Sequence, residues 1–273
     1  MRGSSGGAPR AVREVRLPGA VPLYVHPEWS ERFPWLVQGT TGRGDRDAPF
    51  DLRLFGAEPS GAVLARWRRL REASGLPRAV HAPQVHGADI LVHPPGPPGL
   101  FIGEAHDGHA TRTAGTLLTI SVADCIPVSI VDPERRAIAL VHGGWRGVAA
   151  GVVEAGITVL GALAGSEPQS LYLHLGPAIC GECYEVGPEV FAALGLDAPP
   201  ERRPIDLRAV AAARAAAAGV ALERITVSSL CTRCDGSAFF SHRGGSAERQ
   251  VGILGIREQG KSRDDGRAEG DAR

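Results

Sequence analysis

The sequence lacks an excess of charge of either sign, because thirty basic residues balance thirty acidic ones. A chain without a strong net charge has no global attraction for nucleic acids or for anionic membrane surfaces. We therefore expect neither nucleic acid nor a membrane among its partners. The substrate is expected to be a small molecule that is held at a local site.

Long apolar runs are also absent. The longest apolar stretch covers residues 148–164, but it contains Glu154 and several glycines and is short for a membrane span. Residues 1–15 lack the apolar core of a secretory signal peptide. The five cysteines are an odd number and suit free or metal-bound thiols in a reducing compartment. We expect a cytoplasmic protein, either a monomer or a small homo-oligomer.

The chain length fits a compact catalytic unit between two polar ends. We expect a flexible N-terminal tail over residues 1–15, a single catalytic domain over residues 16–257 and a disordered polar tail over residues 258–273. Internal repeats and an interdomain linker are not evident.

Short apolar runs that predict strands alternate with helical patterns. The predicted strands cover residues 117–122, 137–141, 171–175, 225–227 and 251–256. The predicted helices cover residues 62–73, 148–163 and 207–218, the last with Asp206 as its N-cap. Residues 94–98 and 103–115 read as surface loops. This mixture predicts an α/β (α+β) fold, a layered sandwich with a mixed β-sheet flanked by helices.

Three separate segments offer soft metal ligands beside glycine or aspartate. They supply His86 at 84–87, Cys125 at 123–125 and His142 at 141–147. Two imidazoles and one thiolate suit Zn(II), with Cu also possible, and three protein ligands with a free fourth position are typical of a catalytic zinc. Taken singly, a histidine after a strand is more often structural, and a lone cysteine is commonly a small buried apolar residue. As a set they predict a metal site at the ends of the predicted strands.

A glycine-rich turn follows His142 and leads into the predicted helix. Free backbone N–H groups at such a turn favour an anion, and Arg146 offers a planar fork for phosphate or ribose oxygens. The alternative is that the glycines only permit close packing and that Trp145 belongs to the core.

Several short motifs follow one another along the chain. They are Gln-Val-His-Gly at 84–87, Ala-Asp-Cys-Ile-Pro-Val at 123–128, His-Gly-Gly-Trp-Arg-Gly at 142–147, Gly-Pro-Ala-Ile at 176–179, Tyr-Glu-Val-Gly at 184–187, Cys-Thr at 231–232 and Phe-Phe-Ser-His-Arg at 239–243. In identity and order these motifs resemble those of the laccase-domain purine nucleoside phosphorylases, a bacterial family once described as multicopper polyphenol oxidoreductases. The resemblance covers roughly residues 35–257.

The resemblance implies a zinc held by His86, Cys125 and His142. It implies a layered α/β sandwich that cleaves adenosine, inosine and methylthioadenosine with phosphate and also deaminates adenosine. Cys125, His142 and Asp124 are the expected catalytic residues, with Asp124 either carrying a proton or orienting a ligand. The expected substrate and phosphate contacts are Arg43, Gln84, Arg146 and Arg243, where Arg43 stands in the family's N-terminal arginine motif.

Two other enzyme classes use the same residue types. A copper polyphenol oxidase of the laccase type needs many histidines in His-x-His pairs, and the nine histidines here form no such pair. A metal-free cysteine hydrolase would use Cys125 as the nucleophile and His142 as the base. The sequence alone leaves the second alternative open.

A zinc-ribbon-type binding module is the third alternative. Two Cys-x-x-Cys motifs, at 180–183 and 231–234, are a zinc signal when they stand close together. Here a predicted helix and a long stretch of apolar sequence separate the two motifs. The role of these four cysteines stays open at the level of sequence.

Overall fold

The computed structural model describes residues 9–54 and 56–258. Residues 1–8 of the predicted N-terminal tail and residues 259–273 of the predicted C-terminal tail lie outside this range. Within the stretch predicted as a flexible tail, residues 1–15, β1 (Arg10–Val12) pairs in parallel with β15 (Ile225–Ser228). This pairing gives the N-terminal segment backbone partners that its own polar sequence does not reveal.

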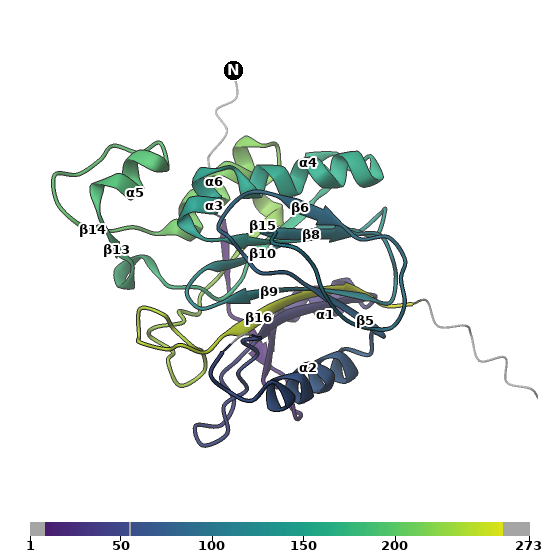
Figure 1. Ribbon diagram of the computed structural model, residues 1–273. Helices are drawn as coiled ribbons and strands as arrows, with labels where there is room; N and C mark the ends of the chain where they lie inside the picture. Colours follow the sequence, from purple (N-terminus) through teal and green to yellow (C-terminus); the bar gives the residue numbers. More distant parts are fainter. Residues whose placement is uncertain (1–8, 55, 259–273) are drawn as a thin grey trace, which may run out of the picture.

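Two seven-stranded mixed sheets form the centre of the fold (Figure 1). The first sheet has the order β1-β15-β12-β10-β11-β8-β6. Its remaining strands are β12 (Tyr172–Leu175), β10 (Ile126–Asp132), β11 (Ala137–Gly143), β8 (Gly108–Thr111) and β6 (Ile90–Val92). The sequence predicted a mixed sheet flanked by helices, and the structure confirms this class but divides the strands between two sheets.

The second sheet has the order β2-β3-β4-β16-β9-β5-β7. Its strands are β2 (Val15–Arg16), β3 (Leu23–Val25), β4 (Leu36–Thr41), β16 (Gln250–Ile256), β9 (Thr116–Val122), β5 (Arg78–His81) and β7 (Gly99–Ile102). A separate two-stranded ribbon joins β13 (Glu185–Val186) to β14 (Arg203–Pro204).

Helices cover the outer faces of both sheets (Figure 1). The helices α3 (Trp145–Ala149), α4 (Val152–Ala164) and α6 (Leu207–Ala217) lie over the first sheet, and α2 (Ser60–Ser74) lies over the second. The short helices α1 (Pro27–Arg32) and α5 (Pro188–Ala193) and three 3-10 turns, η1 (Pro168–Ser170), η2 (Gly181–Cys183) and η3 (Leu222–Arg224), complete the described elements.

Alternating side chains on the central strands build three apolar layers. On β11, Ile138 and Leu140 face the second sheet, while Ala139 and Val141 face the helices α3 and α4. On β9, Leu118 packs between the sheets and Leu117 packs toward α2. Strands that are covered on both faces are mostly apolar, which is why the sequence predicted strands over 117–122 and 137–141.

Two predictions from sequence need correction, and one central strand was missed. The predicted helix over 148–163 is two helices, because Gly151 takes a left-handed φ of 87° between α3 and α4. The predicted surface loop over 103–115 contains β8, a buried strand between β6 and β11. Strand β10 was missed, since its second residue is Pro127 and proline is rarely found in a central strand.

The other predicted elements are confirmed within two residues at each end. Asp206 caps α6 as expected, accepting hydrogen bonds from the backbone N–H groups of Arg208 at 3.0 Å and Ala209 at 3.3 Å. Residues 94–98 lie in the connection between β6 and β7. No helix in the described ranges is long and apolar enough to cross a lipid bilayer.

Candidate metal centre and cavity

The three predicted ligands come together where the chain passes from one sheet to the other. His86 lies on the connection from β5 in the second sheet to β6 in the first, and Cys125 lies on the connection from β9 to β10. His142 stands near the end of β11. One ligand atom from each of the three lies within 4.8 Å of the others, and the two imidazole rings meet edge to face.

Asp107 holds two of these ligands in place, and the sequence analysis missed it. Its carboxylate accepts backbone hydrogen bonds from Val85 at 3.2 Å, His86 at 2.8 Å and Gly87 at 2.6 Å. The carboxylate also lies 3.0 Å from Nδ1 of His142, which leaves the other ring nitrogen of His142 for a metal or a proton partner. An orienting carboxylate of this kind is the usual companion of a histidine ligand.

Backbone strain is concentrated at the same connections. His86 and Asp124 have left-handed φ angles of 63° and 83°, which few residues other than glycine adopt. The three N–H groups gathered on Asp107 fix the turn at His86. Asp124 is fixed in a similar way, because its two carboxylate oxygens accept from the Thr232 hydroxyl at 2.6 Å and the Arg243 backbone N–H at 2.7 Å. These bonds favour an orienting role for Asp124.

The glycine-rich turn after His142 makes room for the ligand set. A Cβ atom on Gly144 would lie 2.7 Å from Cδ2 of His86 and 3.3 Å from Sγ of Cys125. The turn leads into α3, which has only five residues, so a helix dipole adds little to anion binding here. The glycines therefore serve the approach of three ligands.

The charges in the cluster favour the thiolate form of Cys125, which is the form that binds metal. Burial raises the pKa of Cys125, but the charge and the hydrogen bond of His142, together with a hydrogen bond from His86, outweigh burial and lower it. Burial lowers the pKa of His142, yet the negative charge of Cys125 and the hydrogen bond to Asp107 outweigh that effect and raise it. Thiolate sulfur and imidazole nitrogen in this arrangement fit Zn(II) or copper.

A cavity of about 360 Å³ opens beside the ligand cluster. His86 and Cys125 form part of its wall. Its other polar lining residues are Asp124, Arg146, Tyr184, His242 and Arg243, and its main apolar ones are Trp145, Ile179 and Leu207. The volume lies within the range of small-molecule sites.

The cavity lining separates the predicted substrate contacts into two groups. Arg146 and Arg243 line the cavity, and their guanidinium groups lie over the rings of Trp145 and Tyr184. Arg43 is not among the lining residues, because its guanidinium lies over the Phe240 ring and donates to Ser246 Oγ at 3.2 Å.

Gln84 is also outside the lining, since its side-chain amide donates to the backbone carbonyl of Ala82. His242 and Tyr184, which do line the cavity, stand in motifs that the sequence analysis quoted without assigning them a role.

Comparison with known proteins gives consistent matches. Residues 48–257 match the family model described as multi-copper polyphenol oxidoreductase laccase. Purine nucleoside phosphorylase YlmD from Geobacillus stearothermophilus is 32% identical over 253 residues, covering 83% of this chain and 92% of that protein. Adenosine deaminase RL5, from an unknown prokaryotic organism, is 34% identical over 151 residues, covering 51% of this chain and 57% of that protein.

A solved structure matches the fold as well. The crystal structure of YlmD from Geobacillus stearothermophilus superposes with a TM-score of 0.81 and 28% identity, covering 90% of this chain and all of that one. The two chains therefore share one fold.

Proposed function

The chain belongs to the multi-copper polyphenol oxidoreductase laccase family, and we propose that it is a zinc-dependent purine nucleoside enzyme. The proposed reactions are phosphorolysis of adenosine, inosine and methylthioadenosine, and hydrolytic deamination of adenosine. The observation that carries the proposal is the convergence of His86, Cys125 and His142 at a cavity with two arginines on its wall. The names of the relatives YlmD and RL5 supply the two reaction classes.

The ligand set defines what a bound metal would contribute. His86, Cys125 and His142 would hold it, with Asp107 orienting His142. When bound, zinc supplies a Lewis acid that lowers the pKa of a neighbouring water toward neutrality. The remaining chemistry belongs to side chains of the cavity wall.

Phosphorolysis requires a held anion and a protonated leaving base. Phosphate oxygen forms a bond to the anomeric carbon of the ribose while the bond from that carbon to the purine nitrogen breaks, and the purine leaves with the bonding electrons. We assign phosphate binding to Arg146 and Arg243, the two guanidinium groups on the wall. The departing purine takes a proton from a nearby donor.

Tyr184 and His242 are the candidate donors on the cavity wall. Burial, with a further contribution from the negative charge of Cys125, raises the pKa of Tyr184 to about 12, so the phenol stays protonated at neutral pH. Trp145 and Tyr184 offer aromatic faces against which a purine ring can stack.

Product identification tests the proposal directly. The zinc-loaded chain is incubated with adenosine, with and without phosphate. Adenine together with ribose 1-phosphate marks phosphorolysis, and inosine with ammonia marks deamination. Arg243→Ala should raise the KM for phosphate and leave deamination less affected. If the zinc-loaded protein forms neither set of products, the proposed function fails.

One observation favours a second candidate, a cysteine hydrolase that works without metal. The charge of His142 lowers the pKa of Cys125, as in a thiolate–imidazolium nucleophile pair. Treatment with a chelator separates the two candidates, because it should abolish activity of a zinc enzyme reversibly and leave a cysteine hydrolase active. Alkylation of Cys125 that zinc prevents would also favour the metal enzyme.

A further inference from the structure

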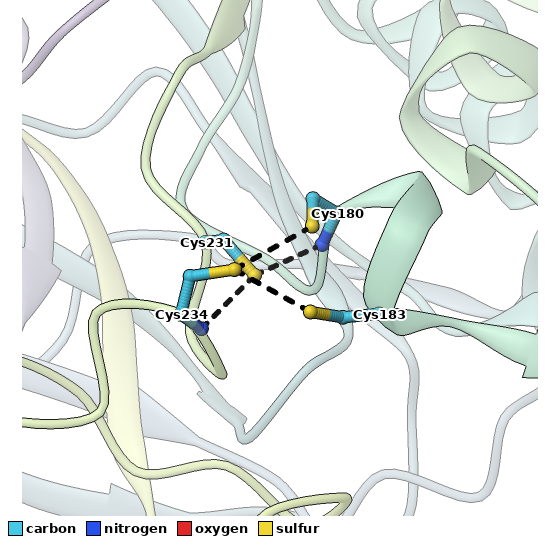
Figure 2. A group of neighbouring side chains, drawn as sticks. All are labelled: Cys180, Cys183, Cys231 and Cys234. Atoms are coloured by element: carbon cyan, nitrogen blue, oxygen red, sulfur yellow. Dashed lines mark hydrogen bonds between the residues drawn. The ribbon is translucent and has the colours of Figure 1, made fainter.

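Four of the five cysteines come together away from the ligand cluster described above. Cys180 and Cys183 stand at the two ends of the turn that contains η2, and Cys231 and Cys234 stand on the segment that follows β15. Figure 2 shows the four side chains gathered from these two segments, with their sulfur atoms in one small region. The Sγ atoms all lie within 4.8 Å of one another, and each cysteine is free of a disulfide.

The distances between these sulfurs suit one shared metal ion. Four sulfurs bound to a single zinc at about 2.3 Å in a tetrahedron lie about 3.8 Å apart. Here the Sγ of Cys234 lies 3.9 Å from that of Cys180 and 3.4 Å from that of Cys183. A disulfide would instead place two sulfurs about 2.05 Å apart.

The backbone around the cluster stabilises negative charge on one of the four sulfurs, that of Cys231. The N–H groups of Cys180 and Cys234 point to Sγ of Cys231, with N···S distances of 3.2 Å and 3.4 Å (Figure 2). Each Cys-x-x-Cys motif is closed into a turn, by the bond from Cys183 N to Cys180 O and by that from Asp235 N to Cys231 O. Hydrogen bonds from backbone N–H groups favour the thiolate, the form that binds metal.

We propose that Cys180, Cys183, Cys231 and Cys234 bind one zinc ion in a closed tetrathiolate site that is separate from the His86, Cys125 and His142 site. Soft thiolate ligands select zinc over magnesium or calcium, and four protein ligands leave no position for substrate. Metal binding displaces the four thiol protons to solvent. The site is structural, and the proposal does not rest on the nucleoside chemistry.

The position of the cluster gives the ion a structural task at the cavity. Ile179 and Tyr184, which line the cavity, directly flank the first Cys-x-x-Cys motif. Thr232, which directly follows Cys231, donates its hydroxyl to Asp124. Ala178 and Cys231 are joined by a single parallel bridge, so the ion would reinforce a contact between two segments that share few backbone bonds. Loss of the ion should loosen this wall of the cavity.

Metal stoichiometry of the full chain tests the proposal. A variant with His86→Ala and Cys125→Ala removes the first ligand set and keeps all four clustered cysteines. Purified with reductant and without chelator, it should retain one equivalent of zinc per chain. Adding Cys180→Ser and Cys234→Ser should remove that equivalent. If the first variant holds no zinc, or the added serines leave its zinc unchanged, the proposal is overturned.

A spectroscopic measurement keeps the test decisive if the serine variants fail to fold. X-ray absorption at the zinc edge of the His86→Ala, Cys125→Ala protein should show only sulfur neighbours, at about 2.3 Å. Nitrogen or oxygen neighbours would contradict the tetrathiolate site. A disulfide between any two of the four cysteines, found by peptide mapping of protein kept under anaerobic reducing conditions, would overturn the proposal as well.

Discussion

The two clusters of candidate metal ligands adjoin one cavity but differ in construction. His86, Cys125 and His142 mix nitrogen and sulfur ligands, and two of them stand on the cavity wall. The cluster of Cys180, Cys183, Cys231 and Cys234 contains sulfur alone, and none of its members is among the lining residues of the cavity. Three protein ligands beside a cavity would leave a fourth position of a bound metal free, whereas four cysteines would enclose an ion completely.

The supporting backbone differs as well. The mixed set depends on connections between the two sheets, on left-handed backbone at His86 and on the buried carboxylate of Asp107. The four-cysteine set depends on two short turns. Strain that persists because its surroundings fix it is typical of functional sites, whereas short Cys-x-x-Cys turns are typical of structural zinc. We therefore propose chemistry at the first set and structural support at the second.

The largest effect is expected from Cys125→Ala. Removal of the thiolate takes away one of three ligands, so phosphorolysis and deamination should both fall to background and one zinc equivalent should be lost. The zinc of the four-cysteine set should remain, and metal analysis beside product assays checks both points. Either activity in a variant that holds no metal at His86 and His142 would break the distinction between the two sets.

A smaller loss is expected from Asp107→Asn. The amide keeps the volume but loses the charge that accepts three backbone N–H bonds and orients His142. Loss of such a partner typically costs about 10- to 100-fold in metal affinity or activity. Asp197→Asn, at an exposed position, is the matched control. Competition with a chelator measures the affinity, and equal affinity in the two variants would contradict the role of Asp107.

Gly144→Ala probes the space around the ligands. The new methyl group would lie 2.7 Å from Cδ2 of His86, so the imidazole must shift and zinc affinity should fall about 10-fold or more. Gly61→Ala is the control, because a Cβ there meets nothing within 4 Å. The four-cysteine zinc should be unaffected in both variants. An unchanged affinity at the first site would show that the turn is not tightly packed against the ligands.

The smallest effect concerns a histidine away from both clusters. Burial lowers the pKa of His81 to about 4, so the unfolded chain binds a proton more readily than the folded one. The contribution of His81 to folding is greatest above pH 6.5 and declines between pH 6.5 and pH 4 by about 1.4 kcal/mol per pH unit. Urea unfolding of His81→Gln should show a correspondingly weaker pH dependence. Acid releases bound metal from the unmodified chain and from His81→Gln alike, so metal loss cancels in the comparison. If the free energy of unfolding had the same pH dependence in both proteins, burial of His81 would not be its cause.

The sequence predicted the three metal-ligand residues but not Asp107, the carboxylate that holds two of them in place. His86, Cys125 and His142 stand in short motifs whose residue types are typical of metal ligands, and the structure brings them together. Asp107 was missed because its surroundings, rich in Gly, His and Thr, read as a surface loop. Only the pairing of β8 with β6 and β11 buries this segment, and such pairing depends on residues far away in the sequence.

Other features of the fold were missed for the same reason, because contacts between residues distant in the sequence determine them. Apolar runs identified β9, β11 and β16, but a run does not tell which sheet a strand joins. Pro127 concealed β10, since proline lacks the N–H that a central strand normally donates. Arg43 was matched by motif, whereas its contacts with Phe240 and Ser246 keep it outside the cavity lining, which only tertiary packing determines.

A crystal structure of the zinc-loaded chain with a purine nucleoside, with anomalous data at the zinc edge, tests the proposed site. We expect an anomalous peak among His86, Cys125 and His142 and the nucleoside in the adjoining cavity beside Arg146 and Arg243. A nucleoside bound elsewhere, or a cavity occupied without any peak at these three ligands, would contradict it.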